Sequence, residues 1–186
     1  VYMTVLMAID QGTTSTRAVA FDKDLNIIHS EQKEYSLLYP NDGWVEIEPK
    51  TLMDSVYATI DPVIDICPDI VAIGITNQRE TTLIWDADSG LPIYNAIVWQ
   101  DRRTADRCMQ LKQAGYEEVI RNKTGLLLDP YFSSTKISWI LDNIDGARTK
   151  AEAGKLRFGT VDTYLLWQLS NGDIFKTDVT NASRTN

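Results

Sequence analysis

Polar residues with the chemistry of a phosphate site follow the first apolar stretch of the chain. The segment from Asp10 to Thr14 reads Asp-Gln-Gly-Thr-Thr and comes directly after the apolar run Met3–Ile9. A glycine lets the backbone turn tightly, and the amides and hydroxyls that follow it can face a phosphate group. Asp10 adds a carboxylate of the kind that holds Mg²⁺ or its bound water. An ordinary hairpin turn without a ligand has the same spacing, and the spacing leaves that alternative open.

Arg17 lies three residues into the stretch that follows this turn. Its guanidinium carries a planar fork of donors that suits phosphate oxygens. The alternative is an exposed strand cation without a ligand. Arg17 is therefore a second candidate phosphate ligand.

A run of polar residues, Thr76–Thr82, separates two apolar stretches that are expected to be buried strands. Polar groups in such a position are unfavourable unless they bind something. Arg79 and Glu80 supply donors and acceptors side by side, which suits a ligand with several hydroxyl groups. The alternative is a solvated hairpin tip with a local ion pair, which contributes about 0 to 1 kcal/mol.

Two aromatic residues extend this candidate polyol site. Trp99 follows the apolar Ala96–Val98 and can pack against the carbon face of a polyol, while Tyr131 lies in the turn Asp129–Ser133 and can offer one hydroxyl. Both residues also fit an ordinary packing role in a core.

The apolar pattern predicts an α/β fold around these groups. Three mostly antiparallel strands open the chain, and a helix that begins at Pro49 and ends before Pro68 follows them. The apolar stripe of that helix consists of Leu52, Val56, Ile60, Val63 and Ile64. Strands are predicted over Met3–Ile9, Thr14–Phe21, Asn26–Lys33, Ile70–Thr76, Thr81–Trp85 and Leu156–Thr160. Helices are predicted over Arg103–Gln113, Glu117–Asn122 and Asp162–Leu169, with another that is capped by Ser133 or Ser134 and carries Ile137, Ile140 and Leu141.

The composition argues against several classes of function. The 186 residues include 18 basic and 26 acidic side chains, and the formal net charge of -8 disfavours a nucleic acid as a partner. Cys67 and Cys108 lie far apart and outside any zinc or redox motif, as expected for thiols in a reducing compartment. The apolar start of the chain is far shorter than the roughly 20 residues of a membrane span. We therefore expect a cytoplasmic enzyme without a membrane span.

Several segments together resemble the FGGY family of carbohydrate kinases, in the family's order and along nearly the whole chain. They are Ala8–Ser15, Gly43–Glu46, Gly74–Thr82, Pro92–Gln100, Asp129–Ser133, Gly159–Thr163 and Thr180–Thr185. Each is a weak motif by itself. Gly-Ile-Thr-Asn-Gln-Arg-Glu-Thr-Thr and the later Asn-Ala-Ser-Arg-Thr are specific to the members that phosphorylate glycerol.

The resemblance implies a ribonuclease-H-like domain of the actin-like ATPase superfamily, which includes sugar kinases, Hsp70 and actin, with a mixed sheet and helices. It also implies transfer of the γ-phosphoryl group of Mg-ATP to glycerol, giving sn-glycerol 3-phosphate. Residues 1–186 then correspond to the amino-terminal domain, incomplete at its carboxyl end, and the nucleotide-binding second domain is absent. The full-length parent is expected to be a homo-oligomer.

Position by position, the resemblance assigns roles to the candidate residues. Arg79, Glu80 and Tyr131 resemble the ligands of the glycerol hydroxyls, and Trp99 the residue against the carbon chain. Asp10 resembles the carboxylate on the magnesium side. The residues that resemble the family's contacts with the nucleotide phosphates are Thr13, Thr14, Ser15 and Arg17.

The family's catalytic base, an aspartate in a Gly-Asp-Gln motif, does not occur in the sequence. We expect that base after Asn186 and expect the chain alone to be inactive. Two alternatives remain at this point: an FGGY kinase for another polyol or a pentulose, and a non-enzymatic actin-like ATPase module.

Overall fold

The structure, a computed structural model, describes residues 4–186 and divides into two compact units. The first unit comprises residues 4–37 and 48–78, and the second comprises residues 38–47 and 79–186. Met3, where the first strand was predicted to begin, lies outside the described residues. The candidate phosphate turn belongs to the first unit and the candidate polyol residues belong to the second.

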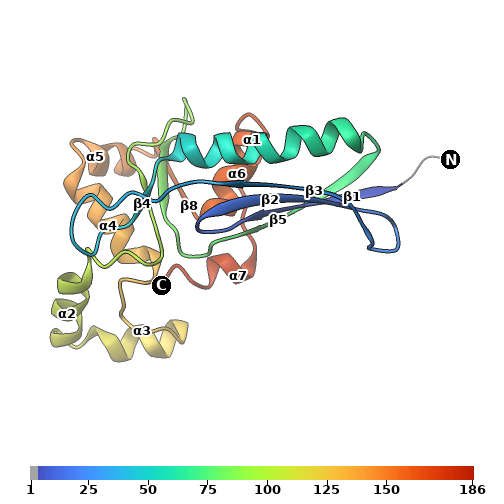
Figure 1. Ribbon diagram of the computed structural model, residues 1–186. Coiled ribbons are helices and arrows are strands. Elements are labelled where there is room, and N and C mark those ends of the chain that lie inside the picture. Colours follow the sequence, from blue (N-terminus) through green and yellow to red (C-terminus); the bar gives the residue numbers. More distant parts are fainter. Residues whose placement is uncertain (1–3) are drawn as a thin grey trace. The chain divides into compact units, whose positions relative to one another are not determined.

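The first unit is a four-stranded mixed sheet with one long helix (Figure 1). The strands β1 (Val5–Gln11), β2 (Ser15–Phe21) and β3 (Ile27–Glu34) are antiparallel neighbours, and β5 (Ile70–Asn77) runs parallel to β1 on its other side. The sheet order is β3-β2-β1-β5. The predicted opening of three antiparallel strands is therefore confirmed.

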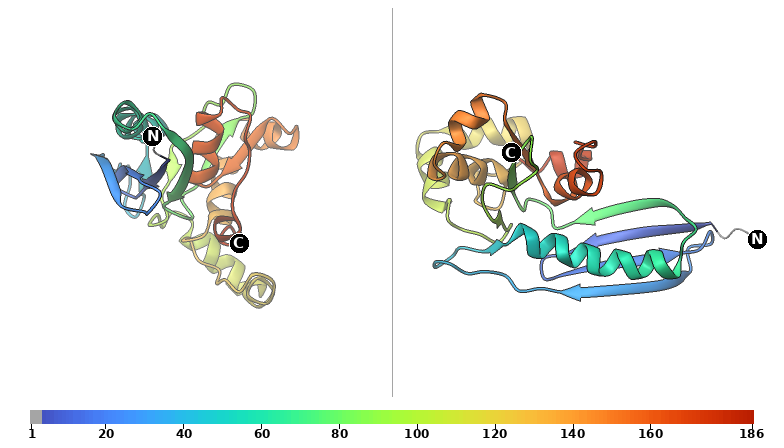
Figure 2. Two further views of the ribbon diagram at one scale, coloured as in Figure 1. Left: turned by 90° about the vertical axis from the view of Figure 1, so that its right-hand side faces the viewer. Right: turned by 90° about the horizontal axis from the view of Figure 1, so that it is seen from above.

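Burial alternates along β1 and β2, so that one face of this sheet is buried and the other is more exposed. Val5, Met7 and Ile9 are buried on β1, and Ala18 and Ala20 are buried on β2. Successive strand residues point to opposite faces, so these five share one face. Figure 2 shows α1 (Pro49–Ile66) running along the sheet. The opposite face carries the exposed Asp10 and Arg17 together with the half-buried Leu6, Ala8 and Val19.

The helix α1 forms for the predicted reasons. Pro49 occupies its first turn, where a missing N–H costs nothing, and the helix ends at Ile66 before Pro68. The stripe residues Leu52, Val56, Ile60 and Val63 are buried as predicted. Ile64 is 43% exposed, so its place in the stripe was wrong. It lies next to Val63 in sequence and is turned about 100° away from it on the helix.

The expectation that β5 is buried was wrong for the part of the chain that the structure describes. Val71 is 65% exposed and Ile73 is 53% exposed. β5 is an edge strand there, paired only with β1, and the register shifts between Val5 and Leu6. Its apolar composition indicated a strand correctly but did not indicate its surroundings.

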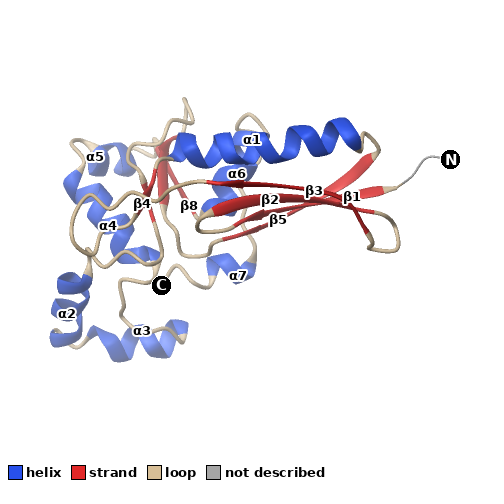
Figure 3. Cartoon of the chain, in the orientation of Figure 1, coloured by secondary structure: helices blue, strands red, loops and turns tan. Residues whose placement is uncertain are grey.

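The second unit consists mainly of helices and loops around two short two-stranded ladders (Figure 3). β4 (Glu46–Ile47) pairs with β7 (Ala96–Ile97), and β6 (Leu83–Asp86) pairs with β8 (Leu156–Gly159), both antiparallel. Ile84, Ile97 and Ile140 form a buried cluster between the ladders and a helix. The helices are α2 (Ala105–Gln113), α3 (Tyr116–Thr124), α4 (Ser133–Asn143), α5 (Ala147–Glu152), α6 (Val161–Leu169) and α7 (Val179–Ala182).

The predicted longer elements of this unit are confirmed within a few residues, and the shortest ones were missed. β4, α5 and α7 span only two to six residues and carry no periodic apolar pattern of their own. The predicted cap of α4, Ser133 or Ser134, was wrong. Phe132 occupies that position, and Ser133 is the first helical residue.

Two further chain-wide features concern the cysteines and the helices. Cys67 and Cys108 are both free and buried, and burial raises the pKa of the Cys108 thiol. Across residues 4–186, no helix combines the length and the apolar character that crossing a membrane requires.

Candidate functional site

The candidate phosphate turn joins β1 to β2 in the first unit. The N–H of Gly12 donates to the carbonyl oxygen of Ser15 at 2.9 Å and closes the turn around Thr13 and Thr14. A Cβ at Gly12 would lie 3.2 Å from that same oxygen. A larger residue would therefore disturb the turn, and this is the physical reason for a glycine here.

The Gly12 carbonyl is held by three side-chain donors. Gln11 Nε2 donates to it at 2.8 Å, Gln78 Nε2 donates at 2.9 Å, and the Tyr35 hydroxyl donates as well. Gln11 and Gln78 are buried. Burial raises the pKa of Tyr35 to about 12, so its hydroxyl keeps the proton that it donates. The sequence analysis missed this support, because nothing in the spacing of Gln11, Tyr35 and Gln78 shows that they meet.

Asp10 and Arg17 lie opposite one another in the β1–β2 register, and Thr76 of β5 lies opposite Asp10 on its other side. All three are exposed, on the face opposite the buried residues of β1 and β2. Arg17 donates to Gln32 Oε1 through Nε at 3.2 Å and Nη2 at 2.8 Å. The guanidinium is therefore held along the strands by a neutral partner, and its charge is not neutralised there.

The candidate polyol residues meet in the second unit. Glu80 is only 2% exposed, and its Oε1 accepts from Arg184 Nε at 2.6 Å. The rings of Trp99 and Tyr131 are in edge contact at 5.6 Å, and the Arg184 guanidinium lies 5.5 Å from the Tyr131 ring. We call Glu80, Trp99, Tyr131 and Arg184 the polyol cluster. The predicted residues Glu80, Trp99 and Tyr131 are thus brought together.

Arg79 and Arg184 differ from what the sequence indicated. Arg79 is exposed, and its guanidinium has no partner in the part of the chain that the structure describes. Arg184, which was not predicted to have a role, pairs with Glu80 across 104 positions of sequence. Only its membership in the segment Thr180–Thr185 pointed to it.

The backbone of Glu80 is unusual. Its φ is 65°, in the left-handed region that residues other than glycine rarely adopt. Its carbonyl oxygen accepts from Thr82 Oγ1 at 3.0 Å, Ser133 Oγ at 3.1 Å and Lys136 Nζ at 3.4 Å. Such a conformation costs about 1 to 3 kcal/mol and persists only when its surroundings determine it strongly. The three hydrogen bonds to the Glu80 carbonyl stabilise this backbone conformation.

Lys136 contributes a buried amine to this arrangement. Its side chain is fully buried, and Nζ also donates to the Tyr131 carbonyl at 2.9 Å. Desolvation lowers the pKa of Lys136 to about 7, against the opposing effect of the Asp101, Glu80 and Asp129 carboxylates and together with the lowering effect of Arg103. The sequence showed Lys136 only as a polar residue within a helix.

A buried ionic cluster anchors the loop that carries Trp99. Arg103 pairs with Glu46 at 2.7 Å and with Asp101 at 2.8 Å, and all three side chains are nearly inaccessible. The guanidinium carbon lies 3.9 Å from the ring centroid of Trp44 and 4.5 Å from that of Trp139, and the two rings contact one another edge to face. Paired with two carboxylates and packed against two indole rings, this cation is well compensated for its burial. We assign the cluster a structural role.

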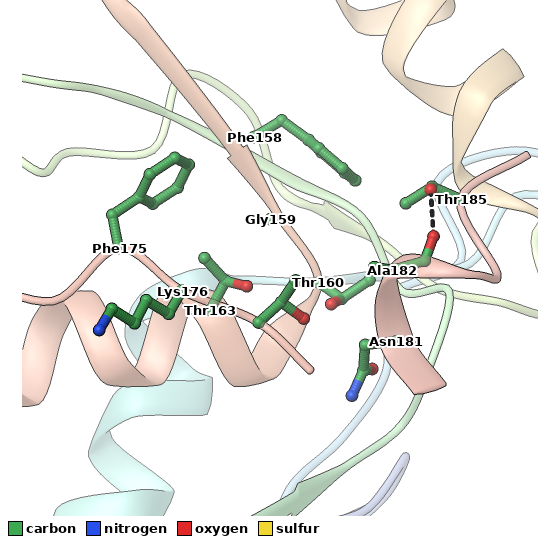
Figure 4. A pocket seen from close by; sticks show the side chains of 10 residues that line it. Phe158, Gly159, Thr160, Thr163, Phe175, Lys176, Asn181, Ala182 and Thr185 are labelled. Carbon is green, nitrogen blue, oxygen red and sulfur yellow. Dashed lines mark hydrogen bonds between the residues drawn. The ribbon is translucent and has the colours of Figure 1, made fainter. Parts of the chain in front are cut away.

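A separate cavity of about 250 Å³ lies beside β8, α6 and α7. Figure 4 shows the side chains around it, with the Thr185 hydroxyl donating to the Ala182 carbonyl at 2.6 Å. Within the described residues, Oδ1 of the buried Asn181 lacks a hydrogen-bond partner. The lining residues are Phe158, Gly159, Thr160, Thr163, Phe175, Lys176, Thr177, Asn181, Ala182 and Thr185.

The chain is similar to a known family over nearly its whole length. The model of the N-terminal domain of the FGGY family of carbohydrate kinases matches residues 5–186. The chain is 56% identical over 184 residues to a glycerol kinase of Geobacillus sp. (strain WCH70) and 57% identical over 185 residues to one of Clostridium perfringens (strain 13 / Type A). Each match covers 97% of this chain but only 37% of the relative's length.

Solved structures show the same fold. The glycerol kinase of Plasmodium falciparum with ADP matches 98% of this chain with a TM-score of 0.93 and 37% identity, and the chain covers 37% of it. The ligand-bound xylulose kinase of Lactobacillus acidophilus matches 98% of the chain with a TM-score of 0.84 and 26% identity, and the chain covers 36% of it. The predicted fold class, a ribonuclease-H-like domain of the actin-like ATPase superfamily, is confirmed.

The buried amine of Lys136 predicts a pH dependence of stability. The pKa of an ordinary lysine is 10.5, and that of folded Lys136 is about 7. Between these values the unfolded chain binds one more proton than the folded protein, so this group makes the free energy of unfolding rise with pH. Below pH 7 both states are protonated and the contribution is constant. Urea unfolding at pH 7 to 9 should show this rise in the wild type and not in Lys136→Met.

Lys50→Met is the matched control, because Lys50 is an exposed lysine whose pKa is raised. Its stability should change with pH in parallel with the wild type across that window. A Lys136→Met curve that also runs parallel to the wild type would show that Lys136 titrates like an exposed lysine.

Proposed function

The chain belongs to the FGGY family of carbohydrate kinases, and we propose that it is the glycerol-binding part of a glycerol kinase. Such an enzyme transfers the γ-phosphoryl group of ATP to glycerol and yields sn-glycerol 3-phosphate. The observation that carries the proposal is the polyol cluster, which presents a buried carboxylate beside two aromatic rings in a chain 56% identical to a glycerol kinase.

The polyol cluster has the groups that a small triol requires. The Glu80 carboxylate accepts from hydroxyl groups, and the exposed Arg79 guanidinium donates to them. Trp99 and Tyr131 offer ring faces and edges to the carbon chain, and the Tyr131 hydroxyl adds a polar contact. The hydrogen bond from Arg184 Nε, at 2.6 Å, fixes the direction of the Glu80 carboxylate.

The phosphate turn suits the nucleotide. In the proposal, Thr13, Thr14 and Ser15 contact the phosphates of ATP, and Arg17 supplies a cation whose partner in the structure is the neutral Gln32. The backbone amides of the turn add donors.

Asp10 fits a magnesium ion of the kind that accompanies ATP. No group of three or more histidine, cysteine or acidic residues that could hold a metal occurs among residues 4–186. Mg²⁺ commonly uses one or two carboxylates and completes its shell with water and substrate phosphates, so the single exposed Asp10 is sufficient. When bound, the ion offsets the charge of the phosphates. Asp10 would hold it, directly or through water.

The catalytic base and most of the nucleotide site belong to the proposal but are not identified in this sequence. A Gly-Asp-Gln motif with the catalytic base does not occur in the 186 residues, and the curated relatives are nearly three times as long. We expect the base and most of the nucleotide site in that additional length. A cytoplasmic location belongs to the same proposal, and the two free cysteines favour it.

A kinase for a pentulose or another polyol is the second candidate, since the xylulose kinase fold matches with a TM-score of 0.84. The identity to glycerol kinases is twice as high as the 26% to that enzyme, and this favours glycerol. Turnover with a panel of glycerol, xylulose and gluconate would separate the candidates.

Substitutions in the polyol site should weaken the use of glycerol. In the full-length protein, Glu80→Ala and Arg79→Ala should each lower kcat/KM for glycerol. The loss should correspond to about 2 kcal/mol or more of transition-state stabilisation, because each variant leaves substrate hydroxyls unpaired. Arg148→Ala is the control, since it removes an exposed arginine from an ion pair with Asp142. Kinetics like those of the control in both variants would exclude Arg79 and Glu80 from the site.

Asp10→Asn should affect turnover far more than glycerol binding. The lost charge acts on the Mg-ATP side, so kcat should fall while the calorimetric Kd for glycerol stays within about twofold. Asp54→Asn removes one exposed carboxylate from α1 in the same unit and should change neither quantity. An equal loss of glycerol affinity in Asp10→Asn would contradict this division between the two sites.

The 186-residue chain alone should release no ADP in response to glycerol. Phosphoryl transfer needs ATP, metal, acceptor hydroxyl and a positioning carboxylate at one point, and proximity accounts for roughly 7 to 11 kcal/mol of barrier lowering. A coupled ADP-release assay on the purified chain tests this. Glycerol-dependent ADP release by the chain would show that the base lies within residues 1–186.

A further inference from the structure

Lys136 carries a fully buried amine. It lies in the first turn of α4, is 0% exposed, and is among the largest fully buried side chains of the described residues. Buried lysines are rare unless they are paired with a carboxylate. No carboxylate forms an ion pair with Lys136 in the described part of the chain. Within residues 4–186, Nζ donates to two backbone carbonyls.

Those two carbonyls belong to Glu80 and Tyr131, which the chain supplies from separate segments. Glu80 follows β5, and Tyr131 lies in the turn before α4. Nζ is 2.9 Å from the Tyr131 oxygen and 3.4 Å from the Glu80 oxygen. One amine therefore joins the backbones of two polyol-cluster residues.

The Glu80 backbone depends on such donors. Its φ of 65° is unfavourable for a side chain that carries a Cβ. Thr82 Oγ1 and Ser133 Oγ donate to the same carbonyl, so donors from two segments converge on it. This conformation sets the direction in which the Glu80 side chain leaves the backbone, and Arg184 Nε then holds the carboxylate at 2.6 Å.

We propose that Lys136 is a positioning residue of the polyol site, which holds Glu80 and Tyr131 at the separation and orientation that the substrate requires. The proposal rests on the proposed function, because it concerns the same site. Lys136 does not touch the substrate; it acts through the two backbones that it joins. The charged groups that influence it are Asp101, Glu80, Arg103 and Asp129.

A purely structural role would have a different signature. A lysine that only filled space or tied α4 to the rest of the unit would, when replaced, lower stability and leave the affinity for glycerol intact. A positioning residue should raise the KM for glycerol selectively. The KM for ATP serves as the internal reference, because the phosphate turn lies in the other unit.

The test uses Lys136→Met in the full-length protein, since methionine keeps an unbranched stem and removes the donors. Ile140→Val is the matched control: Ile140 is equally buried on α4 but belongs to the apolar cluster with Ile84 and Ile97. We expect the KM for glycerol to rise at least tenfold in Lys136→Met and less than twofold in Ile140→Val. The KM for ATP should stay within twofold in both.

A glycerol KM within twofold of wild type in Lys136→Met, or equal rises in both variants, would overturn the proposal. If Lys136→Met does not fold, Ser133→Ala replaces it, because it removes another donor to the Glu80 carbonyl and keeps the lysine. Ser133→Ala should raise the KM for glycerol about threefold, and an unchanged KM would overturn the proposal.

A crystal structure of Lys136→Met separates failure of this inference from failure of the proposed function. We expect Glu80 to leave the left-handed region or the Tyr131 carbonyl to move. If the wild type shows no glycerol-dependent turnover, the proposed function fails while this structural readout still applies. Unchanged Glu80 and Tyr131 backbones in the variant would overturn the positioning role under either outcome.

Discussion

The polyol cluster depends on the hydrogen bonds that converge on the Glu80 carbonyl. Glu80 adopts a left-handed conformation, and Thr82, Ser133 and Lys136 donate to its oxygen. Each bond contributes only about 1 kcal/mol, yet together they offset a backbone cost of similar size. The carboxylate is thereby held buried beside Arg184, where an ion pair costs little because one partner stays partly in water. In the proposed function, these groups are thus ordered before glycerol arrives, which reduces the entropy that binding must overcome.

The phosphate turn is also stabilised by several hydrogen bonds to one backbone carbonyl, and here all the donors are neutral. Three donors converge on the Gly12 carbonyl, from Gln11, Tyr35 and Gln78. Asp10 and Arg17 lie on the exposed face of the strands that this turn joins. In both places a single backbone carbonyl receives one donor from a nearby residue and two from distant segments. A turn supported in this way can present polar groups without moving when charge develops nearby.

The sequence predicted the elements with strong periodicity and the residues with distinctive chemistry. The opening strands and α1 follow from alternation and from a stripe bounded by two prolines. Positions at strand ends pointed to Asp10, Glu80 and Trp99, and a turn before a helix pointed to Tyr131. Short elements such as β4 carry too few residues for a pattern. Lys136 and Arg184 were missed because their roles arise from contacts with Glu80 across 56 and 104 positions. Such pairings depend on tertiary packing, which no local pattern encodes. The exposure of β5 likewise depends on its neighbours in the sheet and not on its composition.

The most direct measurement of the central claim is a glycerol titration of full-length protein labelled with ¹⁵N at its tryptophan indoles. Trp99 belongs to the polyol cluster, whereas Trp167 packs against Trp85 and Phe175 elsewhere in the second unit. The account predicts a saturable shift of the Trp99 indole resonance and none for Trp167. An unchanged Trp99 resonance at saturating glycerol, or equal shifts of both resonances, would contradict it.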